Sequence, residues 1–399
     1  MSQAERNKKS ATIITGIALA VTLVLGYLMV ADIGKPDGRP LNTLAPAGGK
    51  AWEIQNLIVP VFIIAGLVFI VVEIGIIWLA ARFRRRPEDV DGVDEPSQLH
   101  GNTKLEIGWT LAPSLLLAFL AVFSVNGIIS QGKAENPIDV TVIGQQWWWE
   151  YRYDLNDDGK PDIITANEAA IPTGRDVKFH IQSRDVIHSF WIPRLAGKLD
   201  AVPGRTHVRV MDADKPGIFE GQCTEYCGLS HGVMRMQVKA LEPKDYEEWV
   251  KLMTTPPEQP KTDVEKAGQE LFVAQCSFCH QVNGVSPTDK APFTYTKEMD
   301  PDYGVTNDSP LLSRNAPNLT HLMMRQHFVG GLLPLYRGKQ EAVVNPREVY
   351  EPNINNIKRW LRDPHEVKPM NEQNLQGMPN YNLSEDQIEQ LTAFLLTLG

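Results

Sequence analysis

Two groups of sulfur- and nitrogen-bearing residues are candidates for metal chemistry. The larger group runs Cys223-Thr-Glu-Tyr-Cys227-Gly-Leu-Ser-His231-Gly-Val-Met234, and His188 lies upstream of it. Its C-x3-C spacing alone would also fit a structural zinc site or a redox pair. Soft sulfur ligands favour copper, or zinc where only cysteine and histidine take part. Because zinc rarely accepts a thioether, the methionine in this group favours copper.

The second group is Cys276-Ser-Phe-Cys279-His280, which has the C-x-x-C-H form of a covalent haem attachment site. In such sites both cysteines form thioether bonds to the porphyrin, and the histidine binds iron from one face. The sixth ligand is usually methionine, which raises the reduction potential. Met370 and Met378 are the two candidates. We predict Met378, because its Gly-Met-Pro sequence resembles the loop before the last helix of a small cytochrome c, whereas Met370 follows a proline.

Length, charge and cysteine count restrict what these residues could do. The chain has 399 residues, a formal net charge of −9 and four cysteines. The length predicts two or three domains. The acidic balance argues against nucleic acid as a partner and suits attraction of a basic protein. All four cysteines fall in the two close pairs, so metal and haem chemistry account for them better than a disulfide framework does.

Three apolar stretches lie in the N-terminal third, at about residues 11–30, 57–81 and 107–129. Each is near the roughly 20 residues that a helix needs to cross a membrane. Basic residues at 6–9 and 82–86 predict the cytoplasmic ends, so that everything after about residue 131 lies outside. The first stretch also fits a signal peptide. An uncleaved helix is favoured because no small-x-small cleavage site follows, and the final topology is the same either way.

The rest of the chain changes from strand to helix patterns. Short β-branched runs at 138–144, 177–183, 207–211 and 233–240, broken by Gly, Pro or Asp, favour a β-sandwich or barrel. After a proline-rich stretch, the sequence predicts helices at 264–276, 355–361 and 384–398. Ser384 and Gln387 have the spacing of a capping box.

The pattern C-x-E-x-C-x3-H-x2-M with a distant histidine resembles the dinuclear copper centre, CuA, of cytochrome c oxidase subunit II. The resemblance covers about residues 50–250 and includes the aromatic run Gly144-Gln-Gln-Trp-Trp-Trp-Glu-Tyr151. In that family two cysteines bridge both coppers, each copper carries one histidine, and a methionine and a glutamate carbonyl are weak ligands. The ligand set implied here is Cys223, Cys227, His188, His231, Met234 and the backbone carbonyl of Glu225.

The same resemblance implies roles for three further side chains. Trp147 matches the position where electrons enter from cytochrome c, although a tryptophan cluster is more often core or a membrane-interface belt. Glu106 matches a position at the entry of a proton channel, although the helix dipole also favours a carboxylate at a helix start. The carboxylate of Glu225 would help to bind magnesium against subunit I.

With the haem motif, the chain resembles a caa3-type subunit II. The implied fold is multidomain, with N-terminal transmembrane helices, an all-β cupredoxin-like sandwich and a C-terminal all-α class I cytochrome c domain. The expected segments are a signal peptide or extra transmembrane helix at 1–35, a two-helix transmembrane hairpin at 50–131, the CuA domain at 132–253, a Pro-rich linker at 254–262 and the cytochrome c domain at 263–399. Residues 282–314 are expected to form a surface insertion.

This resemblance implies the electron-input subunit of a haem–copper terminal oxidase. Electrons would pass from a cytochrome c-type donor or another complex, through covalent haem c and CuA, to subunit I, where oxygen is reduced to water with proton pumping. No complete active site is expected on this chain, so catalysis belongs to the complex. The expected partners are subunit I, the other oxidase subunits, the donor and the bacterial plasma membrane, with both cofactor domains on the outer, periplasmic side.

Two other functions share part of this pattern. A nitric oxide reductase can use a similar copper domain, and this sequence does not separate the two because the catalytic metals lie elsewhere. A copper chaperone or sensor would not need covalent haem or the tryptophan cluster. Quinol oxidase subunit II is a further relative, but that branch lacks the copper ligands present here.

Overall fold

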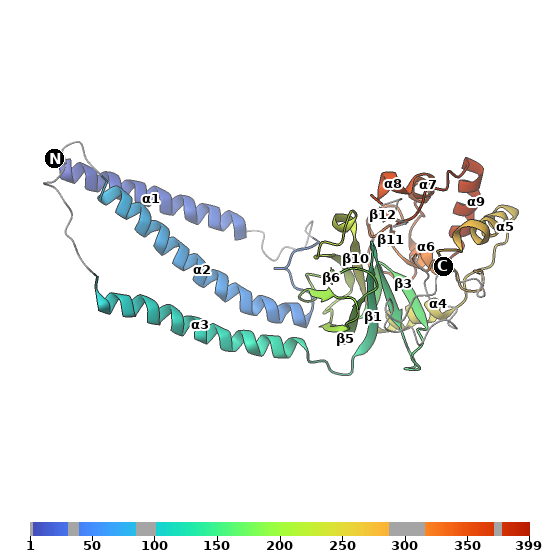
Figure 1. Ribbon diagram of the computed structural model, residues 1–399, viewed down its shortest axis with the longest axis horizontal. Coiled ribbons are helices and arrows are strands. Elements are labelled where there is room, and N and C mark those ends of the chain that lie inside the picture. The colour runs from blue at the N-terminus through green and yellow to red at the C-terminus, as the bar shows by residue number, and fades with distance from the viewer. Residues whose placement is uncertain (1–2, 31–39, 85–100, 287–315, 371–376) are drawn as a thin grey trace. The chain divides into compact units, whose positions relative to one another are not determined.

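The computed structural model describes residues 3–30, 40–84, 101–286, 316–370 and 377–399 (Figure 1). It divides into two compact units, one of Met1–Pro36 with Glu53–Ser130 and the other of Asp37–Trp52 with Gln131–Gly399. Most of the surface insertion predicted at 282–314 lies outside the described residues.

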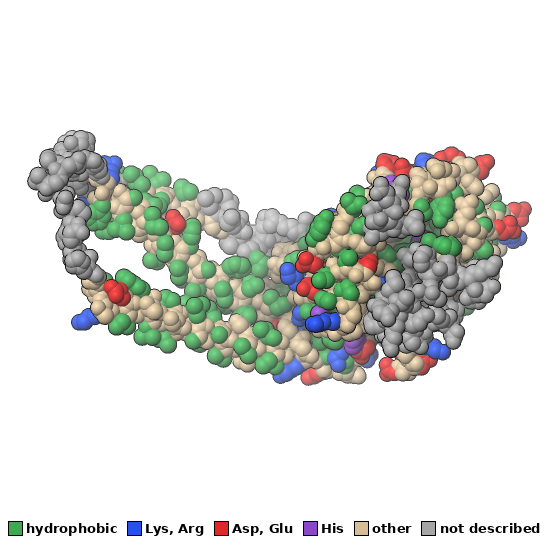
Figure 2. All heavy atoms as spheres, viewed as in Figure 1, with side chains coloured by type: hydrophobic (Ala, Val, Ile, Leu, Met, Phe, Trp, Pro, Cys, Tyr) green, Lys and Arg blue, Asp and Glu red, His purple; other side chains and the backbone are tan. Residues whose placement is uncertain are grey.

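The first unit is built from long helices. These are α1 (Gln3–Val30), α2 (Gly49–Arg82) and α3 (Thr103–Gln131). Both α2 and α3 are long and apolar enough to cross a membrane, and the most apolar part of each has no buried residue. Figure 2 shows hydrophobic side chains along these helices. Exposing so much apolar surface to water would cost roughly 25 cal/mol per Å², so an apolar environment such as lipid would stabilise these helices. The shorter apolar part of α1 is Thr12–Val24.

A β-sandwich begins the main part of the second unit. One sheet has the order β3-β2-β1-β5-β8, a second has β4-β10-β9, and β6 pairs with β7. The strands are β1 (Ile138–Gln145), β2 (Trp148–Tyr153), β3 (Ile163–Ala166), β4 (Glu168–Pro172), β5 (Val177–Ser183), β6 (His188–Phe190), β7 (Leu199–Ala201), β8 (His207–Met211), β9 (Gly217–Gln222) and β10 (Arg235–Leu241). Both large sheets contribute to one core, which includes Phe179 from β5 and Val238 from β10. The predicted all-β sandwich is therefore confirmed.

The strand predicted at 233–240 starts two residues later than expected. His231–Val233 forms a 3-10 turn, and β10 begins after it at Arg235. After β10, the helix α4 (Pro243–Thr254) packs Trp249 and Met253 into the sandwich core.

The C-terminal domain is helical. Its longer helices are α5 (Asp263–Leu271), α7 (Ile354–Arg362) and α9 (Glu385–Leu395), with the short helices α6 (Pro346–Val349) and α8 (Pro364–Val367) and the two-residue strands β11 (His327–Phe328) and β12 (Leu333–Pro334). A π-helical turn, Phe272–Cys276, continues α5. The predicted capping box of Ser384 and Gln387 is present at the start of α9. Phe272 packs against Phe394 with ring centroids 5.3 Å apart, so the haem-motif segment rests on the last helix.

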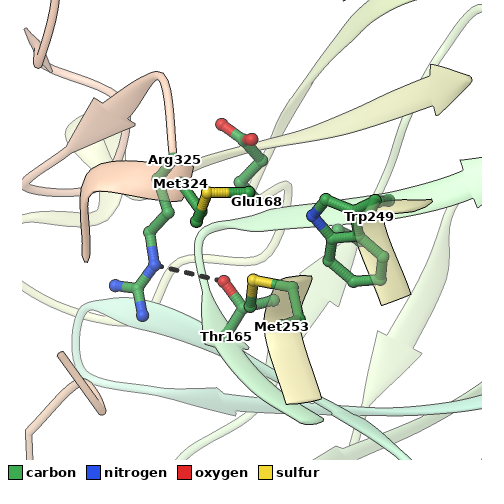
Figure 3. Close-up of a pocket in the computed structure, with 8 residues that line it drawn as sticks. Thr165, Glu168, Trp249, Met253, Met324 and Arg325 are labelled. Carbon is green, nitrogen blue, oxygen red and sulfur yellow. Dashed lines mark hydrogen bonds between the residues drawn. The ribbon is translucent and has the colours of Figure 1, made fainter. Parts of the chain in front are cut away.

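Buried polar residues join the β-sandwich to the helical domain. Glu168 is 5 % exposed, lies 3.2 Å from Lys239 Nζ, and accepts a hydrogen bond from the backbone N–H of Gln326 at 2.9 Å. Arg325 donates from Nε to Thr165 Oγ1 at 3.1 Å beside a small pocket (Figure 3). Burial lowers the pKa of Arg325 to about 10. Buried charges are tolerated only when they are paired and hydrogen-bonded. These contacts therefore favour the one arrangement of the β-sandwich and the helical domain in which every buried charge has its partner.

Candidate metal centre and haem site

Five predicted ligands of the copper group converge in the second unit. The Sγ atoms of Cys223 and Cys227 lie 3.9 Å apart, and both cysteines are buried. His188 Nδ1 is 3.9 Å from Cys223 Sγ, and His231 Nδ1 is 3.5 Å from Cys227 Sγ. Met234 Sδ is 3.7 Å from Cys227 Sγ. Two thiols, two imidazoles and a thioether therefore face one another at separations that ligands of a shared metal centre would have.

Several elements bring these ligands together. Cys223 directly follows β9, His231 opens the 3-10 turn, and Met234 directly precedes β10. The backbone N–H of Cys223 donates to Met234 O at 3.1 Å, which closes the loop at its base. His188 arrives from β6, far earlier in the chain. The ligands therefore depend on strands of the sandwich for their positions.

The sixth predicted donor is the backbone carbonyl of Glu225. Its oxygen lies 3.4 Å from Cys223 Sγ, while the Glu225 side chain is exposed. This set of two thiolates, two imidazoles, a thioether and a carbonyl has the softness that copper prefers. The residues present therefore fit a dinuclear copper centre.

Asp185 orients one of the imidazoles. Its Oδ1 lies 2.8 Å from His188 Nε2, which leaves Nδ1 facing Cys223. Burial lowers the pKa of His188, but its hydrogen bonds with Asp185 and Cys223 outweigh burial and raise that pKa overall. A carboxylate on the outer nitrogen of a metal-binding histidine fixes the ring and increases its basicity. The sequence interpretation missed Asp185; its signal was the carboxylate three residues before His188.

The copper loop is residues 223–234, and its two cysteines differ in acidity. The contact between the two thiols, 3.9 Å apart, lowers the pKa of Cys223 and raises the pKa of Cys227. The thiolate is the metal-binding form of cysteine. The contact between the two thiols therefore favours the thiolate form at Cys223, and metal binding would displace the proton from Cys227.

The predicted haem-binding residues lie where α5 and its π-helical turn end. Cys276 and Cys279 are half-buried, and the backbone N–H groups of Cys279 and His280 both donate to Cys276 O. His280 Nδ1 donates to Pro317 O at 2.8 Å, which leaves Nε2 as the nitrogen available to iron. Burial lowers the pKa of His280, so the neutral, ligating form is favoured. These residues fit covalent haem c. The carbonyl of Pro317 was not predicted as a partner, because every residue carries such a group.

Comparison with known proteins agrees with this geometry. The chain is 32 % identical to the cytochrome c oxidase subunit 2 of Alkalihalophilus pseudofirmus, over 94 % of this chain and 96 % of that protein. Family models match residues 138–241 (cytochrome c oxidase subunit II, periplasmic domain), 40–126 (its transmembrane domain) and 265–399 (cytochrome c). The chain belongs to the cytochrome c oxidase subunit II family.

Other relatives match all or part of the chain. Cytochrome c oxidase subunit 2 of Bacillus sp. strain PS3 is 33 % identical to this subunit II chain, over 93 % of the chain and 94 % of the relative. The periplasmic domain of subunit II from Bradyrhizobium japonicum is 30 % identical, over 31 % of this chain and 96 % of that structure, with a TM-score of 0.28. By its family matches and full-length relatives, the chain is a subunit of an oxidase complex and combines two apolar N-terminal helices, a cupredoxin-like domain and a cytochrome c domain. This family implies CuA copper, and the cytochrome c domain implies haem c.

Trp147 of this subunit II chain lies against the copper loop. It is 3 % exposed, and its Nε1 donates to Cys227 O at 2.9 Å. The backbone carbonyl of Trp147 accepts a hydrogen bond from Lys368 Nζ at 2.5 Å. Trp147 thus connects the copper loop to the helical domain, and its role as the point of electron entry stays a prediction.

Glu106 lies in the first turn of α3 and is exposed. Its Oε1 accepts a hydrogen bond from the backbone N–H of Asn102 at 3.2 Å. This is the stabilising contact that a carboxylate makes at a helix start. Stabilisation of the start of α3 is therefore one reason for a carboxylate at position 106. The proton-channel role of Glu106 stays a prediction.

Met378 and Met370 can be distinguished experimentally as the sixth haem ligand. Met378 is half-buried and packs against the helical core, whereas Met370 Sδ lies against Gly377. We expect Met378→Leu to lower the haem c potential by on the order of 0.1 V, because a thioether ligand raises it and axial ligands span about 0.8 V. Potentiometric titration of the purified oxidase measures this. Met370→Leu is the matched control; a larger shift in the control than in Met378→Leu would reverse the assignment.

Proposed function

We propose that this chain is the electron-input subunit of a haem–copper terminal oxidase. It takes electrons from a cytochrome c-type donor and passes them, via haem c and a dinuclear CuA centre, to subunit I, where oxygen is reduced to water with proton pumping. The observation that carries the proposal is the convergence of the copper donors in the compact unit that also holds the C-x-x-C-H segment. The proposed copper ligands are His188, Cys223, Glu225, Cys227, His231 and Met234, and the proposed haem residues are Cys276, Cys279, His280 and Met378.

The protein's contribution is to fix the positions of the copper and haem ligands and to limit their contact with water. Bound copper and haem supply one-electron transfer, while the chain supplies orientation and environment. Cys223 is 1 % exposed and His188 is 0 % exposed, so water is excluded from these two donors, while His231 is half-buried. Asp185 fixes His188 on one side, and β9 and β10 hold both ends of the loop. Ligands on rigid elements move little, which favours fast electron transfer.

The outer side of the copper loop supports an interface with another subunit. Tyr226 is 76 % exposed and Leu229 is 59 % exposed, although both lie within a loop whose cysteines are buried. The exposed carboxylate of Glu225 is adjacent to them. We place subunit I against this face, with magnesium bound in part by Glu225. We also place the protein in the bacterial plasma membrane with both cofactor domains on the periplasmic side. Trp147 is proposed as the point of electron entry, and Glu106 at the proton-channel entry.

Composition and turnover of the purified complex test the proposal. We expect two coppers and one covalent haem c for each copy of this chain, and oxygen turnover with reduced cytochrome c as donor. Metal analysis, the haem spectrum and oxygen consumption measure these quantities. Zinc in place of copper would contradict the copper assignment. Turnover of nitric oxide with no turnover of oxygen would place the chain in a nitric oxide reductase instead.

A further inference from the structure

The helical domain reaches the copper loop through a buried lysine. Lys368 follows α8, is 6 % exposed, and donates from Nζ to the carbonyl of Trp147 at 2.5 Å. Trp147 in turn donates from its indole nitrogen to Cys227 O at 2.9 Å. Two consecutive hydrogen bonds therefore connect a side chain of the cytochrome c domain to the backbone of a copper-loop cysteine, across 221 residues of sequence between Lys368 and Trp147.

Two further contacts surround this connection. The backbone N–H of Arg235, next to Met234, donates to Gly330 O at 3.1 Å, and Ser230, next to His231, donates to Pro369 O. Space around the lysine is tight, because a Cβ on Gly330 would lie 2.8 Å from Lys368 Nζ and 2.9 Å from Val233 O. The helical domain thus contacts residues that flank two predicted copper ligands, and it covers the backbone of Trp147.

Burying a lysine is an expensive way to join two domains, and burial lowers the pKa of Lys368 to about 7. Burying an ammonium group costs free energy unless it is paired or hydrogen-bonded, and apolar residues of similar volume often stabilise a contact as well or better. The advantage of a lysine is specificity, because its hydrogen bond to the Trp147 carbonyl forms in only one arrangement of the two domains.

We propose that Lys368 is a positioning residue for electron entry. It holds Trp147 and the copper loop against the chain's own cytochrome c domain, so that this domain occupies the surface beside Trp147 and excludes a soluble cytochrome from it. This inference rests on the proposed function and adds the residue that determines which donor reaches the copper centre. A soluble donor then delivers electrons to the haem c domain only.

The test uses the complete oxidase with Lys368→Met. A rapid-mixing experiment measures the rate at which one electron passes from ferrous haem c to the oxidised copper pair. We expect this transfer to slow by about tenfold, the size of effect that corresponds to losing one buried hydrogen bond, while copper and haem contents stay unchanged. Hydrogen exchange at the Arg235 amide, which Gly330 O protects, should become faster. Lys339→Met, which removes an exposed lysine from the same domain, is the matched control and should change neither quantity.

Unchanged transfer and unchanged exchange in Lys368→Met would overturn the proposal. Because a buried substitution can prevent assembly, the wild-type oxidase supplies an independent measurement. Mixed with reduced soluble cytochrome c, its haem c should be reduced before copper, and copper reduction without prior haem reduction would overturn the proposal. A wild-type oxidase whose reduced haem c never reduces copper would contradict the proposed function itself.

Discussion

Replacing Cys223 with serine is expected to abolish the dinuclear copper centre. Its Sγ lies 3.9 Å from Cys227 Sγ, 3.9 Å from His188 Nδ1 and 3.4 Å from Glu225 O, so it is central to the donor set. Serine offers a hard oxygen in place of a soft thiolate, which copper disfavours. Removing only a supporting residue outside the ligand set costs roughly 10- to 100-fold in metal affinity, so losing this ligand should cost more. Copper per haem c and the copper absorption of the purified oxidase measure the loss.

Methionine substitutions provide the comparison for this experiment. Met234→Leu removes a weak ligand, so we expect copper to stay bound with a changed reduction potential. Met236→Leu alters a methionine that is also buried, on β10, but is not a predicted ligand, and it should leave the potential unchanged. If Cys223→Ser keeps the dinuclear spectrum, the assignment of a bridging thiolate is wrong.

Replacing Glu168 with alanine is expected to destabilise the second unit by about 3 kcal/mol, the lower end of the cost of removing one partner of a buried ion pair. The variant leaves Lys239, which is 0 % exposed, without its carboxylate. It also removes the acceptor of the Gln326 N–H and of Gln237 Nε2. Thermal unfolding of the purified oxidase, followed by the haem c absorbance, measures the change in stability.

Two variants sharpen this second prediction. Glu248→Ala removes an exposed carboxylate from α4 and should change stability by less than about 0.5 kcal/mol. The double variant Glu168→Leu with Lys239→Met should recover most of the loss, because replacing both partners with apolar groups avoids a buried unpaired charge. A Glu168→Ala protein as stable as the Glu248→Ala protein would show that the buried network does not hold the two domains together.

Both cofactor sites obtain their precision from groups outside the motifs. Asp185 orients His188, and the carbonyl of Pro317 orients His280. In each case the outer partner binds the imidazole nitrogen that the metal does not need. The same device at both sites determines which nitrogen is available, which is how second partners of metal ligands generally act.

The sequence by itself determined the chemistry, because ligand type and short spacing are local properties. Cys223 and Cys227 are separated by three residues and His280 directly follows Cys279, so a local turn is enough to bring each set of ligands together. The apolar lengths of α2 and α3 and the capping box of α9 are local in the same sense. The strands at 177–183 and 207–211 also matched their predicted limits, since β-branched runs bounded by turn residues carry their own signal.

Only the tertiary structure decided which distant groups meet. Gln326 lies 158 residues from Glu168, and Lys368 lies 221 residues from Trp147. In the second pair the acceptor is a backbone carbonyl, which every residue possesses, so no pattern of residue types could reveal it. Burial is likewise a property of the folded chain: in the sequence, Lys368 resembles any surface lysine. The motifs thus identify which cofactors the chain can hold, whereas long-range packing decides how its two cofactor domains are joined.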